Sequence, residues 1–296
     1  MKLEGLHHIT MITGDAQKNV DFYAGTLGLR LVKKTVNFDS PDAYHLYFGD
    51  EVGSPGTILT WFEFPGAWRG RAGAGMIHTI QLAVASEAAL DFWAERLRAY
   101  GAERAGDSLF FEDYDGLRFE LVVSDMKPRR AEHPEIPAEH AIIGIAGARA
   151  YGAIGAHPLL TDTLGFVEED GVYRLGDFTW TYDPAPEARG LDGAGTVHHI
   201  AWASRDEDHL AWRARVAEAG MHVTGVRDRD YFRSIYFREP RGILFEIATL
   251  SPGFAIDEDP DHLGEQLRLP AQHEHLRAQL ERTLTPVVNP RAAVAR

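Results

Sequence analysis

The chain repeats one pattern four times, and this repeat constrains the fold more than any other feature of the sequence. In the first copy, the β-like run LHHITMIT precedes an amphipathic segment, DAQKNVDFYAGTLGL, and then three more β-like runs, RLVKKTVNF, YHLYFG and GTILTWFEF. Val20, Ala24 and Leu27 stand at i, i+4 and i+7, which is the spacing of one helix face. The predicted unit is therefore strand, helix, strand, strand, strand (βαβββ).

The other three copies keep this order with differing clarity. The second holds MIHTIQLAVAS and the helical segment SEAALDFWAERLRAYG, the divergent third begins with HAIIGIAGARAY, and the fourth runs from TVHHIAWAS to GILFEIATL. We expect units one and two in residues 1–123 and units three and four in residues 140–250. The Pro-rich, charged stretch 124–139 is the expected linker. Residues 251–296 should form a loop and a surface helix, giving an α+β fold.

Composition narrows the range of partners. The net charge is −14, which disfavours nucleic acid and anionic membranes because both would repel the chain. There is no cysteine, so disulfides, thiolate metal sites and cysteine nucleophiles are excluded. The opening residues MKLEGLHHIT show no signal-peptide pattern, and no apolar run reaches the ~20 residues of a membrane span. A cytoplasmic location is expected, and assembly with further copies of the chain stays open.

Two histidine pairs begin matching strands almost two hundred residues apart, in LHHITMIT and TVHHIAWAS. Side chains alternate between the two faces of a strand, so His8 shares a face with Thr10 and His7 lies on the other. In the second strand, His199 and His198 are divided in the same way. Alternation alone does not say which face is internal.

Four βαβββ units with this wording resemble the vicinal oxygen chelate superfamily, which includes glyoxalases, bleomycin resistance proteins and extradiol dioxygenases. The paired HHI strands and the run DRDYFRSIYF are most similar to dioxygenases that cleave the ring of hydroquinones. The resemblance covers about residues 1–250. It implies that units pair into two open, cupped β-barrels with helices outside, and that a metal ion can occupy a cup.

The resemblance also implies the metal ligands. By their match to the superfamily's sequence motif, His8 and His199 are the expected ligands, and Glu246 of EPRGILFEIAT is the expected carboxylate. Aligning units one and four puts Thr60 where Glu246 stands. Two histidines and one carboxylate are the ligands of non-haem Fe(II) oxygenases, which keep positions open for substrate and O₂.

Units two and three lack this set. The equivalent positions in unit two hold Thr79 and Glu120, and unit three has no matching histidine in its first strand. The ligands therefore favour pairing of unit one with unit four around the metal, and of unit two with unit three in a metal-free barrel. Glu120 is expected to be a remnant or an ion-paired residue.

Four further residues match polar groups near the metal in the ring-cleaving relatives. Tyr236, ten residues before Glu246, matches a tyrosine that hydrogen-bonds a phenolic oxygen of the substrate; Arg229, His198 and Thr10 match other polar neighbours. Each has a simpler interpretation as well. Tyr236 fits an ordinary strand aromatic, Arg229 fits an ion pair with Asp228 or Asp230, and His198 fits a brace for its neighbour.

Three further aromatic residues lie near the predicted site residues in the sequence repeats. Phe232, Phe237 and Trp61 are candidates for a wall around a flat ring, without a face assigned to any of them. His45 and His78 are interpreted as structural or surface residues.

The predicted function is an Fe(II)-dependent, extradiol-type dioxygenase that opens a hydroquinone or related diphenol with O₂. Mn(II) takes similar ligands, so the metal is not fixed by the residues. A glyoxalase-like isomerase or lyase is the alternative enzyme, but glyoxalases commonly use two carboxylates where this chain has Thr60 in place of the second. A non-catalytic binding or resistance protein is the third possibility, and such members often lack the triad.

Overall fold

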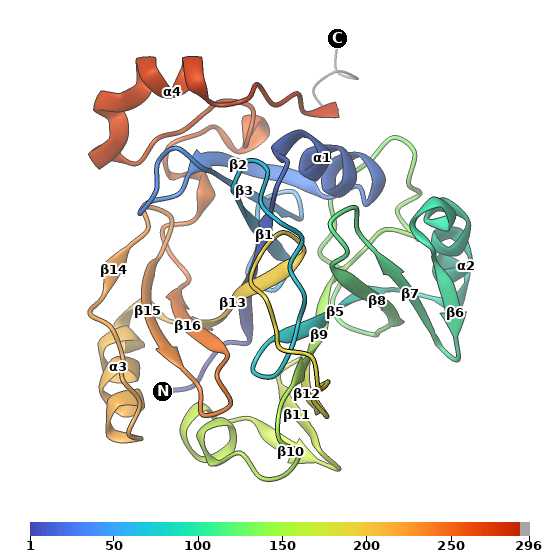
Figure 1. Cartoon of the computed structure of the whole chain (residues 1–296), viewed down its shortest axis with the longest axis vertical. Coiled ribbons are helices and arrows are strands. Elements are labelled where there is room, and N and C mark those ends of the chain that lie inside the picture. The colour runs from blue at the N-terminus through green and yellow to red at the C-terminus, as the bar shows by residue number, and fades with distance from the viewer. Residues whose placement is uncertain (291–296) are drawn as a thin grey trace.

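The computed structural model describes residues 1–290, and in this part of the chain the strands form two eight-stranded sheets (Figure 1). The first sheet has the order β14-β15-β16-β13-β1-β4-β3-β2. Its strands are β1 (Leu6–Thr13), β2 (Arg30–Val36), β3 (Tyr44–Gly49), β4 (Ile58–Glu63), β13 (Thr196–Ser204), β14 (Arg227–Asp228), β15 (Arg233–Arg238) and β16 (Leu244–Thr249). Strands of the first and fourth sequence units thus share one sheet.

The second sheet has the order β10-β11-β12-β9-β5-β8-β7-β6 and combines the second and third units. Its strands are β5 (Ile77–Val84), β6 (Glu103–Ala105), β7 (Ser108–Glu112), β8 (Arg118–Val123), β9 (Gly144–Tyr151), β10 (Val167–Glu169), β11 (Val172–Leu175) and β12 (Phe178–Asp183). The predicted α+β fold of βαβββ units in two cupped sheets is confirmed.

Helices cover the outer faces of both sheets (Figure 1). The α-helices are α1 (Ala16–Val20), α2 (Glu87–Arg96), α3 (His209–Glu218) and α4 (Arg277–Thr283); π-helical turns occupy Asp21–Thr26 and Leu159–Leu164, and 3₁₀ turns occupy Arg98–Tyr100, Asp206–Asp208, Phe254–Ile256, Pro260–His262 and Ala271–Leu276. The expected N-cap of α2 is present, because the Ser86 side chain accepts from the backbone N–H of Ala89. Within the described residues, no helix is long and apolar enough to cross a membrane.

Two local elements differ in detail from the expected pattern. The helix expected in unit one is α-helical for only five residues before it widens into a π-helix, and this wider turn lets the adjacent rings of Phe22 and Tyr23 both enter the core. In the fourth unit, the run HVTGVRDRD (residues 222–230) is the expected strand after the helix, but only β14 forms there. It lies at the exposed edge of the sheet, where it has only β15 as a partner.

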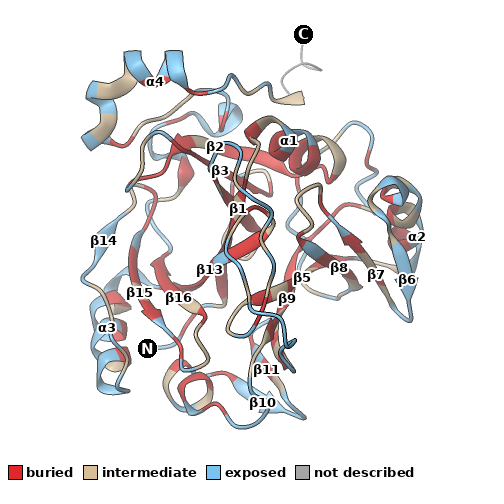
Figure 2. Cartoon of the chain, in the orientation of Figure 1, coloured by how far each residue is buried: buried red, intermediate tan, exposed pale blue. Residues whose placement is uncertain are grey.

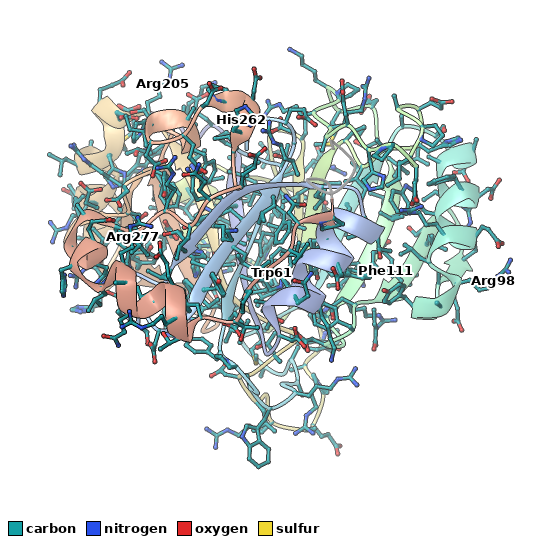
Figure 3. All side chains as sticks on the ribbon, turned by 90° about the horizontal axis from the view of Figure 1, so that it is seen from above. Trp61, Arg98, Phe111, Arg205, His262 and Arg277 are labelled. Carbon is teal, nitrogen blue, oxygen red and sulfur yellow. The ribbon has the colours of Figure 1, made fainter. Side chains whose placement is uncertain are left out.

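The first sheet has an apolar outer face and a polar inner face. Ile9 of β1, Trp61 of β4 and Phe245 of β16 are buried in the main core, towards the helices, while their strand neighbours face the cup. Buried residues are concentrated in these central strands in Figure 2, and Figure 3 shows Trp61 in the interior and Arg98, Arg205 and Arg277 at the periphery. Trp61 packs on Tyr23 with ring centroids 3.8 Å apart.

The aromatic wall expected around a substrate therefore has different members. Trp61 and Phe237 belong to the outer core, whereas Phe232 lies on the cup side. Phe237 packs against Phe245 at 5.9 Å between ring centroids. Trp61 and Phe237 point outwards because each is next in sequence to an inward-facing residue, and side chains alternate along a strand.

The C-terminal segment returns to the first unit and attaches to β2. Lys33, which is fully buried, donates to Asp257 Oδ1 at 2.6 Å and to Glu258. The backbone N–H of Arg268 donates to the carbonyl of Lys34 at 2.9 Å. These contacts fasten the segment over one end of the first sheet, where α4 also lies (Figure 1).

Candidate metal centre

The structure brings His8, His199 and Glu246 together on the inner face of the first sheet. His8 lies on β1, His199 on the neighbouring β13 and Glu246 on the next strand, β16. The Nε2 atoms of the two histidines are 3.3 Å apart, and Glu246 Oε2 lies 2.9 Å from His199 Nε2 and 3.4 Å from His8 Nε2. All three residues are buried.

This spacing fits one metal ion. With metal–ligand bonds of about 2.0–2.2 Å, two ligands at an angle of about 90–110° stand roughly 3.0–3.5 Å apart, close to the three separations here. Apart from the two imidazoles, Glu246 Oε2 is a buried oxygen with no hydrogen-bond partner among the described residues, which is how an atom reserved for a cation would look. One carboxylate and two imidazoles on one side of an ion form the facial ligand set of Fe(II) oxygenases.

The electrostatics of Glu246 favour the ionised form. Burial alone would raise the pKa of Glu246, but His8 and His199 outweigh burial and hold the pKa well below its usual range. Burial also lowers the pKa of His199, against the opposing effect of Glu246. A neutral imidazole and an ionised carboxylate are the forms in which these side chains bind a metal.

Second hydrogen bonds orient each ligand. Ser234 on β15 donates to Glu246 Oε1, leaving Oε2 for the metal position. His7 Nδ1 lies 2.8 Å from His8 Nδ1, and the backbone of Thr249 accepts a hydrogen bond from the His7 ring. Burial, followed by the charge of His8, lowers the pKa of His7 to about 3, so that the ring is neutral and its single N–H serves Thr249.

This contact orients the ring of His8. When His8 donates its Nδ1–H to His7 Nδ1, the lone pair of its Nε2 points towards the metal position. The second histidine pair has the same geometry, with His198 Nδ1 2.7 Å from His199 Nδ1. His198 thus contacts the ligand next to it, as the bracing interpretation expects.

The triad lies in an open pocket of about 400 Å³, a volume that includes the space at its mouth. The lining residues are His8, Asn37, Phe38, Asp39, His45, Tyr47, Phe62, His199, Arg229, Phe232, Tyr236 and Glu246. Five are Phe or Tyr rings and three are the triad. The pocket therefore offers apolar walls for a flat ring beside a metal-binding floor.

Tyr236 and Arg229 both line this pocket. Tyr236 faces Glu246 across β15 and β16, and Arg229 Nε donates to the Tyr236 hydroxyl at 3.3 Å. Burial and the nearby Glu246 raise the pKa of Tyr236, so the hydroxyl keeps a proton that it can donate into the pocket. Arg229 pairs with Asp39 Oδ2 at 3.2 Å, on the loop after β2, instead of the adjacent Asp228 or Asp230.

Thr10 and His198 are not among the residues that line the pocket. Thr10 lies opposite His199 and Thr60 in the strand register, and its hydroxyl is fully buried without a partner among the described residues. The ring of His198 packs on Phe62, with centroids 5.4 Å apart. Both are neighbours of the triad on its own strands.

His45 and Tyr47 were missed as site residues. They stand two apart on β3, so both point into the cup, and both line the pocket. His45 Nε2 hydrogen-bonds the hydroxyl of Thr60, and the Tyr47 hydroxyl lies 2.9 Å from His45 Nδ1. The signal was available in the sequence, because the antiparallel partner of β3 carries Thr60, the residue at the vacated ligand position.

The second sheet shows how a single carboxylate is satisfied without a cation. Ser108 donates to Glu120 Oε1 at 2.7 Å, and the two residues are separated by the same twelve positions as Ser234 and Glu246. Gln81 Nε2 donates to the other oxygen of Glu120 at 2.9 Å. Glu120 is thus held by neutral donors, and His78 of the same unit bonds Asp183 at 2.9 Å.

The sequence matches the model of the Glyoxalase/Bleomycin resistance protein/Dioxygenase superfamily twice, over residues 5–121 and 131–247. The chain belongs to this superfamily. Within it, the chain is 44% identical to "Putative ring-cleaving dioxygenase MhqO" of Bacillus subtilis (strain 168), over 96% of this chain and 97% of the relative. It is 36% identical to "Chlorohydroquinone/hydroquinone 1,2-dioxygenase" of Sphingobium indicum, over 97% and 98%.

A solved structure extends the likeness to three dimensions. The crystal structure of a dioxygenase from Bacillus subtilis, itself described as putative, has a TM-score of 0.89 and 44% identity to this chain. The match covers 97% of this chain and 98% of the other. The first relative is thus named as a putative ring-cleaving dioxygenase, and the second as a dioxygenase of hydroquinones.

Proposed function

We propose that this protein is an Fe(II)-dependent dioxygenase that cleaves the ring of a hydroquinone or related diphenol with O₂. The observation that carries the proposal is the buried His8–His199–Glu246 cluster, open on one side to a pocket with aromatic walls. The naming of the relatives supports the same reaction class. Fe(II) fits the ligand set, and Mn(II) is the competing metal.

The reaction needs no further reductant. Both atoms of O₂ enter the ring-opened product, one carbon–carbon bond of the ring is broken, and the diphenol supplies all the electrons. Fe(II), when bound, lets the diphenol give up a proton and pass electron density to O₂. The protein must therefore hold the ring, keep it in one orientation and supply a proton where negative charge develops.

The residues around the triad meet these requirements. The Tyr236 hydroxyl donates towards the substrate oxygen, and Arg229 donates to that hydroxyl and adds a fixed positive charge. Phe232, within 5.2 Å of the His8 ring between centroids, forms an apolar wall next to the triad. Preorganised donors of this kind contribute most where charge builds up in the transition state.

A glyoxalase-like reaction is the second candidate, and one contact argues against it. The position that could supply a second carboxylate holds Thr60. Its hydroxyl is hydrogen-bonded to His45. A non-catalytic binding protein would not need three buried, converging ligands, because isolating Glu246 in this way is costly without a cation.

The test is oxygen uptake by the full chain, loaded with Fe(II) under anaerobic conditions, against a panel of hydroquinones and catechols. We expect uptake of one O₂ per hydroquinone, none with metal-free protein, and little with Mn(II). No uptake with any diphenol, combined with isomerisation of a glutathione hemithioacetal, would replace this proposal with the glyoxalase-like one.

A further inference from the structure

A short hydrogen-bonded network lies on the inner face of the cup, in the same pocket as the triad. It consists of the Tyr47 hydroxyl, the His45 ring and the Thr60 hydroxyl, and all three residues are buried. The His45 ring is fixed between Tyr47 and Phe62, with centroids 4.0 and 4.4 Å away. Neither hydrogen bond of this network involves His8, His199 or Glu246.

The three hydrogen-bonded groups of Tyr47, His45 and Thr60 carry one more polar hydrogen than their two hydrogen bonds use. Burial lowers the pKa of His45 well below its ordinary value and raises that of Tyr47, so the ring is neutral and the phenol is protonated. A neutral imidazole has one N–H and one lone pair, and each hydroxyl has one hydrogen. The two hydrogen bonds use two of these three hydrogens, whichever tautomer His45 adopts.

Tyr47 is the residue through which these groups can form a further hydrogen bond in the pocket. If His45 donates to Tyr47, the phenol hydrogen is free to be donated; if Tyr47 donates to His45, its oxygen is free to accept. Tyr47 lines the pocket, whereas Thr60 does not. A ligand oxygen in the pocket can therefore meet a partner at Tyr47 in either of its own protonation states.

The position of Tyr47 selects one kind of ligand. In the sheet order, β3 is separated from β13 by β4 and β1, so Tyr47 and His199 start about 14 Å apart, at ~4.8 Å per strand. Both side chains line the same pocket. An aromatic ring with one oxygen at the triad would present a para oxygen towards Tyr47, whereas an ortho oxygen would stay beside the first.

We propose that the Tyr47 hydroxyl, positioned by His45 and Thr60, binds the second oxygen of a para-diphenol and makes the pocket prefer a hydroquinone to a phenol or a catechol. This inference rests on the proposed function and adds the residue that determines its specificity. Tyr47 touches the substrate, while His45 acts through Tyr47 as a positioning residue.

The test is equilibrium binding by calorimetry, without O₂, to the Fe(II)-loaded full chain. Tyr47→Phe should raise the Kd of hydroquinone about five- to tenfold, the usual effect of one net hydrogen bond, and leave the Kd of phenol unchanged. The matched control is Tyr44→Phe on the same strand, whose hydroxyl donates to the Thr285 carbonyl on the outer side. It should change neither Kd.

A second pair of variants tests positioning. His45→Phe keeps an aromatic ring but removes both hydrogen bonds, and should weaken hydroquinone binding as Tyr47→Phe does. His45→Gln, whose amide can accept and donate, should recover part of the affinity. Melting temperatures measured on the same samples separate this pattern from a loss of fold, which would weaken phenol and hydroquinone alike.

The outcomes are distinguishable. Equal losses for phenol and hydroquinone in Tyr47→Phe, or no loss at all, would overturn the role of Tyr47 while leaving the dioxygenase proposal intact if the wild type still consumes O₂ with hydroquinone. Wild-type protein that neither binds hydroquinone nor consumes O₂ with it would overturn both.

Discussion

Replacing Lys33 with Met should destabilise the protein strongly, because it leaves a buried carboxylate without its main cation. The Lys33 ammonium is fully buried and contacts Asp257 at 2.6 Å and Glu258, whose side chain is 2% exposed. It also lies 4.8 Å from the centre of the Tyr231 ring. Met fills a similar volume, so the change removes charge more than packing.

The expected size follows from the burial of Glu258. Asp257 is more than a third exposed and can turn to water. Among the described residues, Glu258 keeps Arg268 as its one ion-pair partner, with Nε at 3.6 Å from Oε1, and a long hydrogen bond from the backbone N–H of Gly264 at 3.5 Å. Removing one partner of a buried ion pair costs about 3–5 kcal/mol. At about 2.1 cal/mol/K per residue, the entropy of unfolding for a chain of 296 residues is about 0.6 kcal/mol/K, so Tm should fall by about 5–8 °C.

Differential scanning calorimetry of metal-free protein at fixed pH and salt measures this shift. Lys34→Met is the matched control, since the neighbouring ammonium makes an exposed contact with the Glu265 carbonyl at 3.1 Å and should change Tm by about 1 °C or less. Lys33→Met combined with Glu258→Leu should recover much of the loss. A single-variant shift below about 2 °C, or no recovery in the double variant, would refute the reasoning.

Three other changes test the site and the linkage to pH. Glu246→Ala should leave the fold intact but remove bound divalent metal, and full metal content by elemental analysis would contradict the ligand assignment. Tyr236→Phe should keep its iron and lose about 10²-fold in kcat for oxygen uptake, about 2.7 kcal/mol, whereas equal rates would leave Tyr236 without a catalytic role. Burial raises the pKa of Asp113 to about 6, so the folded chain binds a proton that the unfolded chain lacks between about pH 4 and 6. As pH rises through that window, this carboxyl should lower the free energy of unfolding by up to about 3 kcal/mol, and above the window the effect should stay constant. In Asp113→Asn, the free energy of unfolding measured by urea denaturation should lose this dependence on pH. An unchanged pH dependence would assign the titration to another group.

The repeat in the sequence predicted the fold because each unit carries its own period. Strands with apolar residues at every second position and a helix with a period of 3.6 leave few alternatives. Histidine pairs begin only the first and fourth units, and this distribution predicted which units share a sheet. Strands of the first and fourth units do lie together. Helix type was not predictable, since the π-helical turn at Asp21–Thr26 depends on how Phe22 and Tyr23 pack against distant strands.

The site could be predicted along strands but not across the pocket. Alternation divides His8 from His7, and the spacing to Tyr236 follows from one hairpin. Arg229, by contrast, pairs with Asp39 from another unit, and nothing in the sequence around either residue indicates this contact. The signal for His45 lies in the neighbouring strand that carries Thr60, and not in the residues next to His45 in sequence.

The joining of β1 to β13 sets the order in which the molecule can be completed during its synthesis. His8 and His199 are 191 residues apart, and at about 5–20 residues per second the ribosome needs roughly 10–40 s to make the stretch between them. Until then β1 lacks one of its two neighbouring strands, while the second sheet, whose strands lie between them in sequence, can already form. A nascent or truncated chain therefore cannot gather all three ligands, and an oxygen-activating metal would be held only once the last strand, β16, has been added.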